Sequence, residues 1–220
     1  TVLIKAFQDA NALRLAYESG EVDVAFGLTN DVATSLKKKG FNAVDYSAGY
    51  QYYCFLNLNR DHIKDIHFRK ALDLLVNRQE IIDALGGGDI PTGLFAKNFS
   101  FNGDQKIVYD VDKAKEEFKQ AGYSYNGGKL VDKDGNNVKL SILTYSAKPD
   151  LPIIGQVLVS DLEQVGIEAT VRLADSIDEE AEKGDHDILL YAQNPTASGN
   201  PHYFFAQHFK TGSVKNHSYY

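Results

Sequence analysis

The 220-residue sequence contains a single cysteine, Cys54, and no methionine. One cysteine excludes an intramolecular disulfide framework, and it also excludes a zinc site built from several thiolates. Cys54 lies within the apolar run 52–56. We therefore expect its side chain to be a small buried hydrophobe.

The sequence also lacks long apolar runs and clusters of one charge. No window approaches the ~18 apolar residues of a membrane span, and residues 1–5 lack the charged stretch that opens a signal peptide. We expect any signal peptide of the parent protein to lie outside these residues. The formal net charge is -7, but acidic and basic residues are interleaved. No basic stripe is therefore available for nucleic acid or for an anionic membrane.

Signatures of common catalytic sites are missing as well. The sequence has no G-x-S-x-G elbow, no H-E-x-x-H helix and no P-loop. The glycines at 86–88 follow a predicted helix rather than a strand, so they fit a helix stop better than a phosphate loop. We expect a protein that is not an enzyme.

Helical and strand patterns alternate along the chain and predict an α/β fold with a mixed β-sheet flanked by helices. Asp9 and Asp110 are predicted helix N-caps, and Gly20, Gly86 and Gly122 are predicted helix stops. The predicted strands are 2–7, 22–26, 50–59, 139–145, 167–173 and 187–191. A further strand signal occurs at Tyr46. The predicted helices are 9–20, 29–36, 67–76, 78–85, 110–122, 151–165 and 177–183, with hairpin turns at 125–130 and 134–137.

Five segments, in this order, resemble the C-terminal lobe of the nickel- and peptide-binding proteins of ABC importers, the large two-lobed periplasmic-binding-protein type. They are 13–25, which ends in S-G-E-V-D-V-A, 55–59, 68–82, 112–123 and 164–169. The resemblance implies that residues 1–220 are a single C-terminal ligand-binding lobe with a periplasmic-binding-protein-like fold. It also implies a missing N-terminal lobe of the same chain, an ABC permease as partner and an extracytoplasmic location. A membrane contact is expected only through a lipid anchor outside these residues.

Two segments bear on the ligand. Peptide binders of this superfamily commonly carry a carboxylate for the peptide amino group, expected here near Ala197, but the segment 191–205 contains no carboxylate. The segment 144–152 resembles the nickel branch, although Lys148 stands where that branch has Arg and Asn200 where it has Asp. We therefore expect nickel or a metal chelate with histidine or an opine-like molecule. An oligopeptide ligand is the alternative, and a chaperone or sensor on the same lobe stays open.

The residues predicted to hold the ligand lie in the last thirty positions. In a chelate-capture mode, amide, cationic and phenolic groups would hold the organic chelator, and we predict these residues to be Tyr191, Asn194, His202, Lys210 and Asn216. His202 is also the predicted metal ligand, since imidazole suits nickel. For each residue, a plain surface role is the alternative. No cofactor is expected, because nickel or its chelate would be the transported ligand.

Three other histidines are expected to be solvated. His62, His67 and His186 stand beside charged loop residues. Tyr50, Tyr52 and Tyr53 belong to a predicted strand, so their side chains should alternate between the core and a wetter face.

Overall fold

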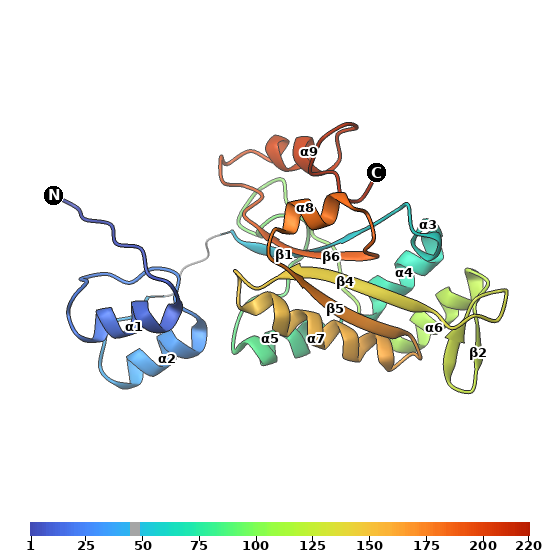
Figure 1. The fold of residues 1–220 in the computed structure, drawn as a ribbon, viewed down its shortest axis with the longest axis horizontal. Coiled ribbons are helices and arrows are strands. Elements are labelled where there is room, and N and C mark those ends of the chain that lie inside the picture. Colours follow the sequence, from blue (N-terminus) through green and yellow to red (C-terminus); the bar gives the residue numbers. More distant parts are fainter. Residues whose placement is uncertain (45–48) are drawn as a thin grey trace. The chain divides into compact units, whose positions relative to one another are not determined.

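The computed structural model describes residues 1–44 and 49–220. These residues divide into two compact units, Thr1–Tyr46 and Ser47–Tyr220 (Figure 1). The strand signal at Tyr46 lies outside the described residues. The assignment of residues 1–220 to a single lobe stays a prediction, and each unit is described by itself.

The first unit contains two helices, α1 (Ala10–Glu18) and α2 (Asn30–Lys38). Asp9 caps α1 as predicted, since its carboxylate accepts the Ala12 N–H at 2.8 Å. The predicted strands at 2–7 and 22–26 were wrong, because the described residues of these segments form no β-ladder. An extended apolar segment becomes a strand only when a neighbouring strand accepts its backbone hydrogen bonds.

Four strands among the described residues form the main sheet of the second unit. They are β1 (Gln51–Leu56), β4 (Lys139–Tyr145), β5 (Glu168–Ala174) and β6 (Ile188–Gln193), in the order β1-β6-β4-β5. β4 runs parallel to both β5 and β6, whereas β1 runs antiparallel to β6. The predicted mixed sheet is therefore confirmed. A separate antiparallel hairpin pairs β2 (Ser124–Asn126) with β3 (Lys129–Val131).

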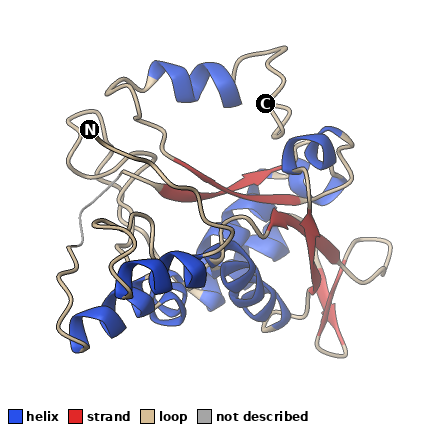
Figure 2. Cartoon of the chain, turned by 60° about the vertical axis from the view of Figure 1, so that its left-hand side comes forward, coloured by secondary structure: helices blue, strands red, loops and turns tan. Residues whose placement is uncertain are grey.

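Helices lie on both sides of this sheet (Figures 1 and 2). On one side, below the strands in Figure 1, lie α5 (Arg78–Leu85) and α7 (Asp150–Glu163). On the other side, above the strands, lie α8 (Ile177–Glu182) and α9 (His202–His208). The remaining helices are α3 (Asp61–Lys64), α4 (Ile66–Leu75) and α6 (Val111–Gln120). None of the helices formed by residues 1–44 and 49–220 is long and apolar enough to cross a membrane.

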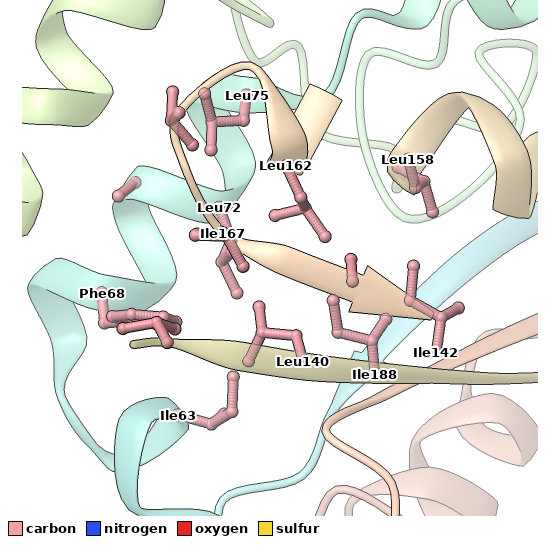
Figure 3. Close-up of a cluster of buried hydrophobic side chains, with 14 of the residues drawn as sticks. Ile63, Phe68, Leu72, Leu75, Leu140, Ile142, Leu158, Leu162, Ile167 and Ile188 are labelled. Carbon is pink, nitrogen blue, oxygen red and sulfur yellow. The ribbon is translucent and has the colours of Figure 1, made fainter. Parts of the chain in front are cut away.

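Alternate residues along the strands feed two cores, because successive side chains of a strand point to opposite faces. Leu140 and Ile142 of β4, with Ile188 of β6, join the larger core, which α4, α6 and α7 complete (Figure 3). Leu143 and Leu189 turn to the other face, where a smaller core contains Phe55, Phe95, Ala174, Ala181 and Phe204. Both faces of the central strands are therefore buried, as their nearly continuous apolar sequences require.

Predicted helix ends agree with the structure. Asp110 accepts the Lys113 N–H at 3.0 Å and caps α6. Gly86 ends α5 with a φ of 71°. Gly166, between α7 and β5, has a φ of 76°, and a Cβ at this position would lie 2.2 Å from the Gly128 carbonyl oxygen. The hairpin thus packs directly against this glycine, and the Leu130 N–H donates to the Gly166 carbonyl at 3.0 Å.

Asp187 ties three segments of the second unit together. Asp187 is 3% exposed, and its carboxylate accepts hydrogen bonds from the Ser141 N–H at 2.8 Å and the Ser141 hydroxyl at 2.9 Å. Arg60 Nε donates to the same carboxylate at 2.9 Å. Asp187 therefore joins the start of β6 to β4 and to the segment after β1.

The prediction that Cys54 is buried was wrong. Cys54 is exposed, although it lies in β1 between the half-buried Tyr53 and the buried Phe55. β1 is an edge strand of the sheet, paired only with β6 among the described strands. A side chain on an edge strand has neighbours on one flank only, so an apolar sequence does not ensure burial there.

Candidate functional site

The strand directions bring several polar residues to one edge of the main sheet. β4, β5 and β6 are parallel, so their carboxyl ends share an edge, and the antiparallel β1 places its amino end there. The residues Tyr50, Tyr145, Lys148, Tyr191 and Asn194 stand at or just beyond these strand ends. We call this set the carboxyl edge. Open α/β sheets bind ligands outside the carboxyl ends of their strands.

A cation and an aromatic ring meet at the carboxyl edge. Lys148 Nζ lies 4.7 Å from the centroid of the Tyr50 ring, which is a cation–π distance. Tyr50 is half exposed, so the Lys148 ammonium contacts the ring and stays accessible to solvent. Nearby, the Tyr52 hydroxyl donates to Asp150 Oδ2 at 2.5 Å, which engages one of the two oxygens of that carboxylate.

Two phenols of the carboxyl edge, Tyr145 and Tyr191, stay protonated at neutral pH. Burial raises the pKa of Tyr145 to about 12 and raises the pKa of Tyr191. The two rings lie 5.6 Å apart between centroids. Neutral phenols act as hydrogen-bond donors as well as acceptors, which suits the recognition of carboxylates or amides.

Sequence reasoning placed Tyr191 and Asn194 among the ligand residues, and both lie at the carboxyl edge. Tyr191 lies in β6, and the nearby Lys215 ammonium opposes the rise in its pKa that burial causes. Asn194 Oδ1 accepts the Thr196 N–H at 3.1 Å, and a Cβ on Gly49 would lie 3.4 Å from the same oxygen. The backbone before β1 therefore passes close to Asn194.

The other three predicted residues stand on the segment that follows. His202 begins α9 and is exposed, and Lys210, two residues beyond α9, is exposed as well. Asn216 is half buried, and its side chain bonds the backbone of Tyr220, with Nδ2 donating to the carbonyl oxygen at 3.3 Å. Asn216 thus holds a turn of its own segment, whereas His202 and Lys210 face solvent.

Sequence reasoning did not assign ligand roles to Tyr50, Tyr145 or Lys148. The signal for Lys148 was present, since it stands where the resembling branch has Arg. The signal for Tyr50 was the alternation of the strand 50–59. Only the tertiary structure shows that the Tyr145 ring lies beside Tyr191 and that the Lys148 ammonium lies over the Tyr50 ring.

The residues described here contain no group of three or more His, Cys, Asp or Glu side chains that could hold a metal ion. His208 is buried, stacks on Phe55 at 4.6 Å between centroids, and its Nε2 lies 2.5 Å from Gln193 Oε1. The assignment of His202 as a metal ligand stays a prediction.

An open mixed sheet with helices on both sides and polar residues at its carboxyl edge defines a periplasmic-binding-protein-like α/β fold. The chain belongs to the bacterial extracellular solute-binding proteins, family 5, whose middle-region model matches residues 1–216. This membership confirms the predicted family and the extracytoplasmic location.

Relatives with different ligands in their names are similar to this chain. The oligopeptide-binding protein AppA of Bacillus subtilis is 26% identical over 182 residues, covering 80% of this chain and 34% of AppA. The nickel-binding protein NikA of Staphylococcus aureus is 29% identical over 155 residues, covering 67% of this chain and 29% of NikA. A crystal structure of a nickel ABC transporter protein from Bacillus halodurans matches with a TM-score of 0.75 and 27% identity, over 97% of this chain and 46% of that one. The chain therefore spans about a third of the length of the curated relatives it matches.

Proposed function

We propose that this chain is part of the solute-binding component of an ABC importer that captures nickel or a metal chelate. Its family membership and its similarity to a nickel-binding protein support this proposal. The ligand would lie between the carboxyl edge and a facing lobe of the same protein, and an ABC permease would receive it. The protein would bind and release its ligand without catalysing a reaction.

The charge of the carboxyl edge is the observation that favours a chelate over a peptide. Lys148 carries a positive charge beside the Tyr50 ring, and the segment 191–205, where peptide binders carry a carboxylate for the peptide amino group, contains none, although Asp175 follows the outer strand β5. The nearby Asp150 carboxylate accepts the Tyr52 hydroxyl. An ammonium and neutral phenols suit the carboxylates of an organic chelator, whereas a peptide amino group requires an anionic partner.

The remaining proposed ligand residues would complete this set. Tyr191 and Asn194 contribute from β6, and His202, Lys210 and Asn216 contribute from the segment beyond it. In this mode the organic molecule wraps the metal, so the protein needs no cluster of metal ligands. Nickel is the cargo, and direct ligation by His202 would add to the chelator's own contacts.

An oligopeptide is the second candidate ligand. It is favoured by the similarity to AppA, which covers more of this chain than the similarity to NikA does. A peptide C-terminal carboxylate could use Lys148 in the same way as a chelator carboxylate. The two candidates therefore differ in the partner of the peptide amino group.

The deciding experiment is calorimetric titration of the complete two-lobed protein with nickel plus excess histidine, and separately with a mixed oligopeptide pool. Binding of the nickel–histidine mixture alone supports the proposal. Binding of peptides alone refutes it and establishes the oligopeptide alternative.

A pair of variants tests the role of the carboxyl edge. Lys148→Gln removes the charge, and we expect about tenfold weaker binding of an anionic chelate, which corresponds to one charge-assisted hydrogen bond. Lys133→Gln, at an exposed position outside the carboxyl edge, is the matched control and should bind normally. Equal affinities of the two variants for the chelate would show that Lys148 does not contact the ligand.

A further inference from the structure

A loop between α5 and α6 brings aromatic side chains to the carboxyl edge. Residues 92–105, which we call the aromatic loop, contain Phe95, Phe99 and Phe101 and form neither a helix nor a strand. A loop holds a binding side chain in place only when a rigid scaffold positions it. The contacts of the aromatic loop therefore decide whether its rings can act on a ligand.

Hydrogen bonds close the base of the aromatic loop. The Asn102 side chain accepts the Phe95 N–H at 3.2 Å and donates to the Thr92 hydroxyl at 3.0 Å. The Gln105 N–H donates to the Thr92 carbonyl at 2.8 Å. A Cβ on Gly93 would lie 2.3 Å from Asn102 Oδ1, so the backbone packs directly against this amide. The loop thus holds its own shape.

Two contacts fix the aromatic loop to the rest of the second unit. Phe95 is 4% exposed, belongs to the smaller core, and meets the Phe204 ring of α9 edge-on at 5.8 Å between centroids. The Tyr53 hydroxyl of β1 donates to the Leu94 carbonyl at 2.5 Å. The position of the loop relative to β1 and α9 is therefore set.

A row of rings leads from the smaller core to the surface. Phe101 meets Phe95 edge-on at 5.1 Å between centroids and stacks on Phe99 at 5.2 Å, with 26° between the ring planes. Phe101 is 37% exposed and Phe99 is half buried. Within residues 1–44 and 49–220, Phe101 is the only aromatic ring that contacts Phe99. One face of Phe99 is thus supported by a ring, and the other is not.

The Phe99 ring reaches the carboxyl edge at Gly49. A Cβ on Gly49 would lie 3.9 Å from Phe99 Cε2 and 3.4 Å from both Asn194 Oδ1 and Thr196 Oγ1. An aromatic ring, an amide oxygen and a hydroxyl therefore surround one point beside β1. Gly49 has a φ of 68°, a conformation that favours glycine, so this backbone position carries no side chain that would cover the point.

A phenylalanine ring at a ligand site can discriminate by shape and by its π face. It offers neither charge nor hydrogen bonds, so it cannot distinguish one carboxylate from another. Aromatic pairs gain affinity from offset stacking beyond the area that they bury. A metal-bound imidazole is flat, and the metal ion withdraws electron density from it, which suits the electron-rich face of phenylalanine. An aliphatic amine arm has no such face.

We propose that Phe99, supported by Phe101, is a specificity-determining residue of the carboxyl edge that selects metal chelates carrying a flat heteroaromatic ring over chelates of aliphatic amines and carboxylates. This inference rests on the proposed function. Lys148 and the phenols would bind the chelator carboxylate, and Phe99 would discriminate between chelators that present the same carboxylate.

Calorimetric titration of the complete two-lobed protein with two nickel chelates tests this selection. One chelator is L-histidine, and the other is L-2,3-diaminopropionate, which also has two nitrogens and a carboxylate but no ring. Both are used in excess, under conditions where each forms a two-to-one complex with nickel. Titration of each amino acid without nickel corrects for binding of the free chelator. We expect the unmodified protein to bind the histidine complex more tightly.

Variants of Phe99 identify the ring that is responsible. Phe99→Leu should weaken binding of the histidine complex by about threefold to tenfold, the range of a stacking contact, and should change binding of the diaminopropionate complex by less than about twofold. Phe99→Tyr keeps the ring and should keep the preference. Tyr125→Leu is the matched control, since Tyr125 is 37% exposed and lies in β2, outside the carboxyl edge, and should bind both complexes normally.

The outcomes separate this inference from the proposed function. Equal affinity of the unmodified protein for the two complexes overturns the selection by Phe99 while the chelate-binding function stands. The same holds if Phe99→Leu weakens both complexes equally, which would give Phe99 a structural role only, or weakens neither. Binding of neither nickel complex refutes the proposed function, and the inference falls with it.

Discussion

Removing the Asp187 carboxylate should destabilise the second unit strongly. Two hydrogen bonds from Ser141 reach this buried carboxylate, and bonds to a charged group contribute about 1.5 kcal/mol or more each. The Arg60 pair adds less, because the arginine side chain is 43% exposed and can return to water. We expect Asp187→Ala to lower the free energy of unfolding by ~3 kcal/mol and Asp187→Asn, which keeps one acceptor oxygen, by about half of that.

Urea denaturation followed by far-ultraviolet circular dichroism is the appropriate assay, because the sequence has no tryptophan to report by fluorescence. Asp185→Ala is the matched control. Asp185 also pairs with an arginine, Arg172, but its side chain is 56% exposed, so its loss should cost less than about 1 kcal/mol. If Asp187→Ala loses no more stability than Asp185→Ala, the assignment of Asp187 as the link between β4, β6 and Arg60 is wrong.

Two further substitutions test other parts of the second unit in the same assay. Gly166→Ala should lower the free energy of unfolding by more than about 2 kcal/mol, because it combines a left-handed φ with a Cβ 2.2 Å from the Gly128 oxygen. Gly122→Ala is the control, since Gly122 has a φ of 89° but no atom within 4 Å, so this variant should show the conformational cost alone. Equal losses of stability in the two variants would contradict the close contact at Gly166. Burial raises the pKa of Asp161 to about 6, although its carboxylate accepts the Asn77 N–H at 3.0 Å. Because this folded-state pKa lies above the unfolded one, the stabilising contribution of Asp161 is complete below about pH 4 and is lost as the pH rises through about 6. Asp161→Asn should therefore gain ~1–2 kcal/mol at about pH 7.5 and little at about pH 4.5, and a gain that does not depend on pH would refute the role of ionisation.

Helices and central strands of the second unit could be predicted from the sequence because their signals are local. Asp110 and Gly86 mark helix ends by cap chemistry that depends on neighbouring residues alone. The apolar sequences of β4 and β6 require cover on both faces, which the structure supplies. In these cases local preference and tertiary packing agree.

The errors concern properties that only the tertiary structure decides. Segments 2–7 and 22–26 have strand composition, yet a strand also needs a partner, and none pairs with them among the described residues. Cys54 has apolar neighbours but lies on an edge strand. His186 has charged neighbours in the sequence, yet the tertiary structure buries it completely.

The candidate site was predicted in part. Two of the predicted ligand residues, Tyr191 in β6 and Asn194 directly after it, lie at the carboxyl edge, and their ligand role stays a prediction. Tyr50 was not assigned, since its place near the end of β6 depends on the antiparallel pairing of β1 with β6, and Lys148 was not assigned, since its contact with the Tyr50 ring is a tertiary one. Sequence order gives no sign that a residue near position 50 meets one near position 190.

The position of β6 in the sheet has a consequence for biosynthesis. β6 is the last strand in the sequence but lies between β1 and β4, and it is the strand with which β1 pairs in the described sheet. At translation rates of about 5–20 residues per second, β1 emerges roughly 7–27 s before its neighbour exists. During that interval its backbone groups have no ladder to join, so the nascent sheet stays open until residues 188–193 arrive. The late strand thus keeps the second unit from folding early, a state in which a polypeptide can still be threaded through a membrane pore.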